Sequence, residues 1–193
     1  MIKVSVIVPF KNAKDTLSEC VEHVINDHYP DKEIILVDDG SDDQAHLTLP
    51  EDQSVRLIRL DHSHGPAYCR NLGAEKARGD VLICIDADIL IPPGTINQFV
   101  NTFRENPEAA AVVGMLSDQC LYSNICSCFF NLRKHFDYLS IKNKYITALY
   151  GAICSIRKNV FEQYEGFSDG YHKATVEDAE LATRLIAGNE KII

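Results

Sequence analysis

The segment VLICIDADILIPPG, residues 81–94, sets two carboxylates in the middle of a strongly apolar stretch. Val81–Ile85 is a continuous apolar run of strand length, and Pro92-Pro93-Gly94 supplies a turn shortly after it. The run predicts a buried strand that ends at Asp86-Ala87-Asp88. Continuous apolar strands are typical of a parallel sheet that is covered by helices on both faces.

Helical signals lie on both sides of this segment. Gly65-Pro66 opens a helix that Gly79 closes, and its small residues predict close packing on the sheet. A second helix is expected around residues 93–103, and a third at 17–25, with Asn12 as a plausible N-cap. Further strands are predicted at residues 4–8, 33–37, 55–60, 109–113, 148–156 and 191–193, and further helices at 157–164 and 175–187.

The alternation of strands and helices predicts an α/β fold. It gives right-handed βαβ units and a central, mostly parallel sheet flanked by helices. Residues 1–193 are interpreted as a single domain because no linker, repeat or low-complexity segment divides them. Residues 115–147 mix helical and loop signals and give no clear element. The last residues begin a new strand, so we expect the C-terminal part of a longer protein to be missing.

Composition and charge exclude several classes of function. A net charge of −9 argues against a nucleic-acid partner. No stretch of 18 apolar residues occurs, so no membrane span is expected in this chain. The seven scattered cysteines indicate a reducing cytoplasm, and the spacing of Cys120, Cys126 and Cys128 is poor for zinc.

Acidic residues follow two of the predicted strands. Asp38-Asp39 ends one strand and Asp86-Ala87-Asp88 ends another, so both groups should reach the same edge of the sheet. If Asp86 and Asp88 stay extended, they point to one side and need a cation such as Mg²⁺ or Mn²⁺. From the residues alone this metal site is as good an interpretation as a plain strand end.

Three other polar positions have two interpretations each. The DDGSDD stretch, residues 38–43, is turn chemistry, but a carboxylate there can also accept hydrogen bonds from a base or ribose. Arg70 is either a solvated arginine or a phosphate contact. Thr175-x-x-Asp178 is a capping box, although a carboxylate in a first helical turn can also serve as a general base.

Four blocks in order resemble the family 2 glycosyltransferases of GT-A fold, which use nucleotide-diphosphate sugars. They are VSVIVPFKNA, EIILVDDGSDD, GPAYCRNLGAEKARGDVLICIDADILIPPG, and GF followed by VEDAELATRL. The resemblance covers nearly the whole chain. Two departures stand out: the first loop is Phe10-Lys11-Asn12, and the absence of tryptophan excludes the Gln-x-x-Arg-Trp motif of processive members.

The resemblance implies a role for each candidate residue. It implies an inverting transfer from a nucleotide-diphosphate sugar, most often a UDP-sugar, to a hydroxyl of a carbohydrate or lipid-linked acceptor, with Mn²⁺ or Mg²⁺. It also implies polysaccharide or cell-envelope glycan synthesis in the cytoplasm, compatible with peripheral association at the inner face of the membrane. By this resemblance Pro9, Asn12, Asp39, Arg70 and Asp86 bind the nucleotide, Asp88 binds the metal, and Asp178 is the catalytic base.

Two alternatives stay open. A sugar nucleotidyltransferase would share the sheet and the metal, but it normally has a glycine-rich loop where this chain has PFKNAKDT. A non-catalytic nucleotide-sugar-binding module would be expected to lack one of the acidic sites, and all are present.

Overall fold

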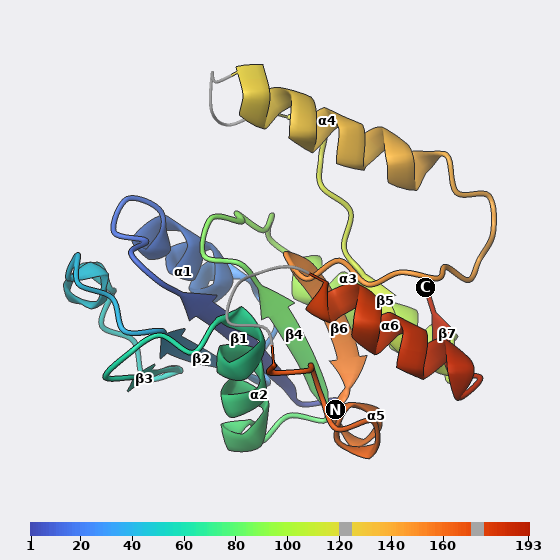
Figure 1. The fold of residues 1–193 in the computed structure, drawn as a ribbon, viewed down its shortest axis with the longest axis horizontal. Helices are drawn as coiled ribbons and strands as arrows, with labels where there is room; N and C mark the ends of the chain where they lie inside the picture. The colour runs from blue at the N-terminus through green and yellow to red at the C-terminus, as the bar shows by residue number, and fades with distance from the viewer. Residues whose placement is uncertain (120–124, 171–175) are drawn as a thin grey trace.

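The computed structural model describes residues 1–119, 125–170 and 176–193, with the backbone alone for residues 126, 127 and 130. Within these residues the chain forms a three-layer α/β structure around one sheet (Figure 1). The strands run in the spatial order β3-β2-β1-β4-β6-β5-β7. Their bounds are β1 Val4–Phe10, β2 Lys32–Asp38, β3 Val55–Arg59, β4 Val81–Ile85, β5 Ala109–Val113, β6 Ile153–Arg157 and β7 Lys191–Ile192.

Strand direction divides the sheet into two parts. Strands β3, β2, β1 and β4 are mutually parallel, as the alternating pattern predicts. Strand β6 runs antiparallel to both of its neighbours, β4 and β5, and β7 pairs in parallel with β5. The mostly parallel α/β fold predicted from the sequence is therefore confirmed.

Helices cover both faces of the sheet. Alternate residues of β1 point to opposite faces, so Val4, Val6 and Val8 join one core cluster while Ile7 joins the other. Helices α1 (Leu17–Asn26) and α3 (Thr95–Glu105) pack on the first face. Helices α2 (Pro66–Lys76), α5 (Lys158–Gln163) and α6 (Glu177–Ala187) pack on the second.

Some boundaries differ from the sequence prediction. The N-cap of α1 is Thr16, so the capping role predicted for Asn12 is wrong. Strand β6 begins at Ile153 rather than near residue 148, because a turn closes with a hydrogen bond from Ile153 N–H to Tyr150 O. Two elements were not predicted, the short 3₁₀ helix η1 (Ala45–Thr48) and helix α4 (Ile125–Leu139).

Among the described helices, none has the length and apolar character that would be needed to cross a lipid bilayer. Helix α4 is the longest of them at 15 residues, and it lies apart from the three layers (Figure 1).

Helix α2 approaches β1 closely because Gly73 has no side chain. A Cβ at Gly73 would lie 2.5 Å from Ile7 Cγ2, which is itself fully buried. This close approach also sets the position of Arg70, one turn earlier on the same helix.

We predict that Gly73→Val lowers the free energy of unfolding by about 1–3 kcal/mol, because the added methyl groups overpack the contact with Ile7. Urea denaturation measures the change. The matched control is Gly170→Val, since a Cβ at Gly170 meets nothing within 4 Å. Equal stability of the two variants would contradict the close-packing explanation.

Candidate active site

The two acidic segments lie at the same edge of the sheet, as predicted. Strand β1 runs between β2 and β4 and is parallel to both. Phe10 pairs with Asp38, and the N–H of Asp39 donates to Phe10 O at 2.8 Å. Asp86 follows the last residue of β4 directly. Pro9 is buried within β1 at this end, opposite Val37.

Asp39 anchors the loop that leads into helix α2. Its buried carboxylate accepts hydrogen bonds from Ser63 Oγ at 2.6 Å, His64 N at 2.7 Å and Gly65 N at 3.0 Å. Burial alone would raise the pKa of Asp39, but the hydrogen bonds from His64, Ser63 and Gly65 bring that pKa below its ordinary value. The folded protein therefore favours the ionised carboxylate.

Asn12 links the loop after β1 to the loop after β2. Its backbone is left-handed, with φ of 51°, and its N–H donates to Ser41 Oγ at 2.9 Å. Its side-chain Oδ1 accepts from the N–H of Asp42 at 3.0 Å. Asn12 thus holds the two loops together at the edge where Asp39 lies.

Asp86 and Asp88 do not continue the strand. The N–H of Ile89 donates to Asp86 O at 3.0 Å, so residues 86–89 form a turn instead of the extended segment that would point both carboxylates to one side. Asp88 is exposed, whereas Asp86 is half-buried and ion-paired with Arg70. Burial raises the pKa of Asp86 despite the Arg70 guanidinium, and the nearby charges of Asp88 and Glu177 act in the same direction.

Arg70 is buried, so the solvated interpretation is wrong. Only 3% of the residue is exposed. Its guanidinium donates to Asp86 Oδ1 at 2.8 Å, to Glu177 Oε1 at 3.1 Å and to Gly151 O at 3.2 Å. Burial acts to lower the pKa of Arg70, but the Asp86 carboxylate raises it overall. We call Arg70, Asp86, Gly151 and Glu177 the Arg70 cluster.

Asp178 lies in the first turn of α6, next to this cluster. Its Oδ2 accepts from Gly151 N at 3.0 Å, and its Oδ1 accepts from Ala179 N at 2.8 Å. The predicted capping box cannot be judged, because Thr175 lies outside the described residues; the N-cap of α6 is Val176. Backbone N–H groups thus fix both carboxylate oxygens of Asp178.

Two members of the site were missed from the sequence. Glu177 is 5% exposed and pairs with Arg70, and Gly151 contacts Arg70 and Asp178 through its two backbone groups. Glu177 stands beside Asp178 at a helix start, where an acidic residue is ordinarily explained by the helix dipole. The sequence alone does not show that Glu177 is buried, because its partner Arg70 is far away in the chain and only the fold brings the two together.

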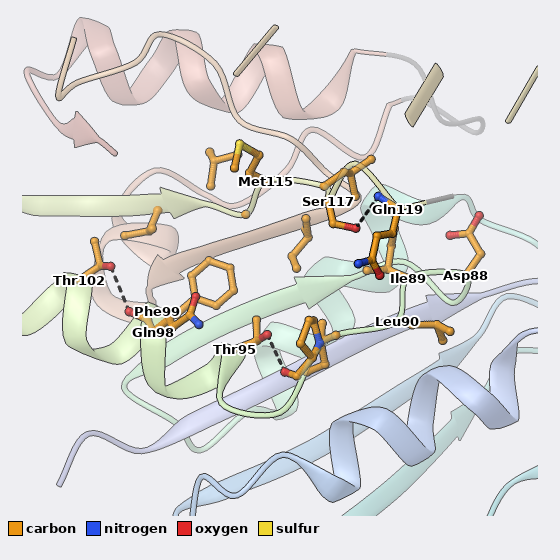
Figure 2. A pocket seen from close by; sticks show the side chains of 17 residues that line it. Asp88, Ile89, Leu90, Thr95, Gln98, Phe99, Thr102, Met115, Ser117 and Gln119 are labelled. Carbon is orange, nitrogen blue, oxygen red and sulfur yellow. Dashed lines mark hydrogen bonds between the residues drawn. The ribbon is translucent and has the colours of Figure 1, made fainter. Parts of the chain in front are cut away.

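A pocket of about 400 Å³ opens beside Asp88. Its walls come from the turn after β4, from helix α3 and from residues 112–119 after β5. Figure 2 shows Asp88 at one end and Thr102 at the other, with Phe99 between them. The lining is largely apolar, with a few polar side chains such as Gln98 and Ser117.

A metal ion at this edge would be held by one or two carboxylates and by the substrate, not by a cage of protein ligands. Among the described residues, no group of three or more His, Cys, Asp or Glu side chains is arranged to hold a metal ion. Mg²⁺ and similar ions are commonly held by one or two carboxylates together with substrate phosphates. An exposed Asp88 beside a half-buried Asp86 fits that second kind of site.

The lowered pKa of Asp39 predicts a specific pH dependence. Its ionised form stabilises the fold above the unfolded-state pKa of about 4, and this contribution is lost as the pH falls through the lower folded-state pKa. We therefore expect the free energy of unfolding of Asp39→Asn to fall less steeply in acid than that of the unmodified chain. Denaturation between about pH 5 and pH 2.5 tests this linkage, and parallel curves would refute it.

The buried Arg70 predicts a large loss of stability on truncation. In Arg70→Met the carboxylates of Asp86 and Glu177 lose their counter-charge, which typically costs about 3–5 kcal/mol of unfolding free energy. Arg56→Met is the matched control, because Arg56 is exposed on β3. Urea denaturation of both variants should separate them clearly. Similar values would mean that the ion pairs do not hold the site together.

Known proteins are similar to this chain in sequence. A sequence profile described as "Glycosyl transferase family 2" matches residues 5–165. A glycosyltransferase, GlyG, of Streptococcus pneumoniae is 33% identical over 115 residues, which is 58% of this chain and 38% of that protein. A poly-beta-1,6-N-acetyl-D-glucosamine synthase of Staphylococcus epidermidis is 28% identical over 114 residues, 58% of this chain and 28% of that protein.

Solved structures share the fold over the whole chain. The mannosyltransferase PcManGT of Pyrobaculum calidifontis, in complex with GDP-Man and Mn²⁺, superposes with a TM-score of 0.78 at 20% identity and covers 100% of this chain. S. aureus TarS 1–349 with UDP-GlcNAc gives 0.73 at 18% identity, also over 100%. This chain covers 54% and 56% of those two chains. It adopts the GT-A fold, and with the profile match over most of its length it belongs to glycosyl transferase family 2.

Proposed function

We propose that this chain transfers a sugar from a nucleotide-diphosphate donor, with a UDP-sugar as the first candidate, to a hydroxyl acceptor with inversion. The observation that carries the proposal is the Arg70 cluster, which joins the Asp86–Asp88 turn to Asp178 through Gly151. The proposed metal ligand, Asp88, and the proposed base, Asp178, are thereby both positioned by the buried Arg70 cluster. The proposed setting is cell-envelope glycan synthesis, as the names of the staphylococcal relatives support.

Asp39 is proposed to bind the nucleotide base. Its ionised carboxylate is held in place by hydrogen bonds from Ser63, His64 and Gly65 and is the kind of acceptor that an N–H of the base would need. Pro9 and Asn12 are proposed to complete the nucleotide-binding edge around Asp39, because they lie on β1 and on the loop that follows it. Arg70, which already binds protein carboxylates, is proposed to act near the nucleotide by positioning Asp86.

Asp88 is proposed to hold Mn²⁺ or Mg²⁺ together with diphosphate oxygens, while Asp86 contributes from the ribose side. When bound, the metal ion offsets the charge that develops on the departing diphosphate. A solved relative of the same fold contains GDP-Man and Mn²⁺, which supports a divalent ion without identifying it for this chain.

Asp178 is proposed to be the general base. Two backbone N–H groups orient its carboxylate, and the N-terminus of α6 favours a negative charge at that place. It would take the proton of the acceptor hydroxyl while that oxygen attacks the anomeric carbon. The bond from this carbon to the diphosphate breaks on the opposite face, which inverts the configuration.

Two substitutions separate the proposed roles. Asp88→Asn should lose Mn²⁺-dependent binding of UDP, measured by calorimetry, because an amide is a poor ligand for a hard cation. Asp178→Asn should bind UDP as tightly as the unmodified chain and lose transfer by about 10²- to 10⁴-fold, because it lacks the base. Glu51→Gln is the matched control, since Glu51 is exposed at a distance from this edge.

The donor is identified by a thermal-shift screen of nucleotide sugars with Mn²⁺, since a ligand that binds the folded state raises its melting temperature. Release of pyrophosphate from a nucleoside triphosphate and a sugar phosphate would favour a nucleotidyltransferase instead. Donor binding without transfer to any hydroxyl or to water would favour a non-catalytic binding module.

A further inference from the structure

Helix α4 carries an apolar stripe whose side chains are largely exposed. Residues separated by 4, 7, 11 and 14 positions fall on one face of a helix. Ile125, Phe136 and Leu139 are 85%, 60% and 55% exposed. The complete stripe consists of Ile125, Phe129, Leu132, Phe136 and Leu139.

A side of α4 that adjoins the apolar stripe contacts the body of the protein. Asn131 Nδ2 donates to Ser117 O at 2.7 Å, and His135 Nδ1 lies 2.7 Å from Leu116 O. Lys134 Nζ lies 5.0 Å from the centre of the Tyr150 ring. The exposed fractions of Ile125, Phe136 and Leu139 show that the apolar stripe faces solvent, and Figure 1 shows α4 lying apart from the three layers.

Basic residues accompany the apolar ones. Between residues 125 and 145 the chain has four lysines and arginines against one aspartate, whereas the whole chain carries −9. Lys144 is ion-paired with Glu108 at 2.9 Å, so the local net charge is +2 when Glu108 is included. Ile141 and Tyr145 are also exposed and alternate with Lys142 and Lys144. We call Ile125–Tyr145 the basic apolar surface.

We propose that the basic apolar surface docks on an anionic lipid bilayer. Apolar side chains on one face of a helix, flanked by lysine and arginine, are the combination that binds at the headgroup boundary, with its charge complementary to anionic lipids. The local positive charge is complementary to an anionic lipid surface, whereas in a symmetric dimer the same basic segment of a second copy would repel it.

Docking by α4 would also orient the candidate active site. Side chains of α4 contact the backbone of Leu116 and Ser117, and these two residues line the pocket beside Asp88. Tyr150, which lies under Lys134, directly precedes Gly151 of the Arg70 cluster. The inference stands apart from the proposed reaction, because it rests on the charge and exposure of this one segment.

Vesicle co-sedimentation tests the proposal. We expect binding to vesicles of phosphatidylcholine with about one third phosphatidylglycerol, little binding to phosphatidylcholine alone, and weaker binding at about 0.5 M salt. Phe136→Ser combined with Leu139→Ser should weaken binding at least about tenfold. Arg133→Glu combined with Lys142→Glu should do the same by reversing the local charge.

Leu47→Ser is the matched control, because Leu47 is 69% exposed on η1, outside the basic apolar surface. Circular dichroism and the melting temperature establish that each variant remains folded. The proposal is overturned if the unmodified chain binds neither vesicle, if it binds both equally, or if both double variants bind as the unmodified chain does. Self-association that Phe136→Ser and Leu139→Ser abolish, without vesicle binding, would instead identify a second copy as the partner.

Discussion

The site depends on the ion pairs of one buried arginine. Arg70 leaves α2 and binds Asp86 after β4, Gly151 before β6 and Glu177 at the start of α6. Each partner comes from a different part of the chain, and all converge at the carboxyl edge of the sheet. A guanidinium is suited to this place because its planar donors satisfy several acceptors at once and it keeps its charge when buried. The site edge is therefore rigid where α2, β4 and α6 meet.

This arrangement gives two neighbouring carboxylates different tasks. Asp86 is half-buried and already paired, so it has less capacity to bind a cation, whereas Asp88 is exposed beyond the turn. The difference comes from the turn that closes at Ile89, not from the residue types. On the other side of Arg70, Glu177 takes the buried position and Asp178 keeps the more accessible one. In both pairs, one carboxylate is ion-paired with Arg70 and its neighbour is more accessible, as the proposed roles of Asp88 and Asp178 require.

The sequence predicted the sheet well because its strands are continuous apolar runs. Val81–Ile85 and Ala109–Val113 have the predicted bounds, and the shared edge of Asp39 and Asp86 follows from parallel strands. The prediction failed for residues whose burial or role depends on contacts with distant parts of the chain. Nothing local distinguishes a buried Arg70 from a solvated one, and Gly151 has no side chain to signal its role. Helix α4 was not predicted because cysteines, lysines and aromatic residues are mixed along its sequence. Its apolar stripe is exposed, so it does not give the clear pattern of a buried helix face.

A physical conflict remains between rigidity and access in this fold. Arg70 and its partners fix the edge, yet under the proposed function a donor and an acceptor must both reach it. The pocket beside Asp88 and the segment that carries α4 lie on the side of β5 and β6, away from the Asp39 loop. The side proposed to bind the nucleotide, built from β1, β2 and β4, is thus separate from the side bounded by residues 112–119. Sequence changes in residues 112–119 can therefore alter the side proposed to bind the acceptor without disturbing Arg70. The irregular sequence pattern that begins in this segment is consistent with such variation.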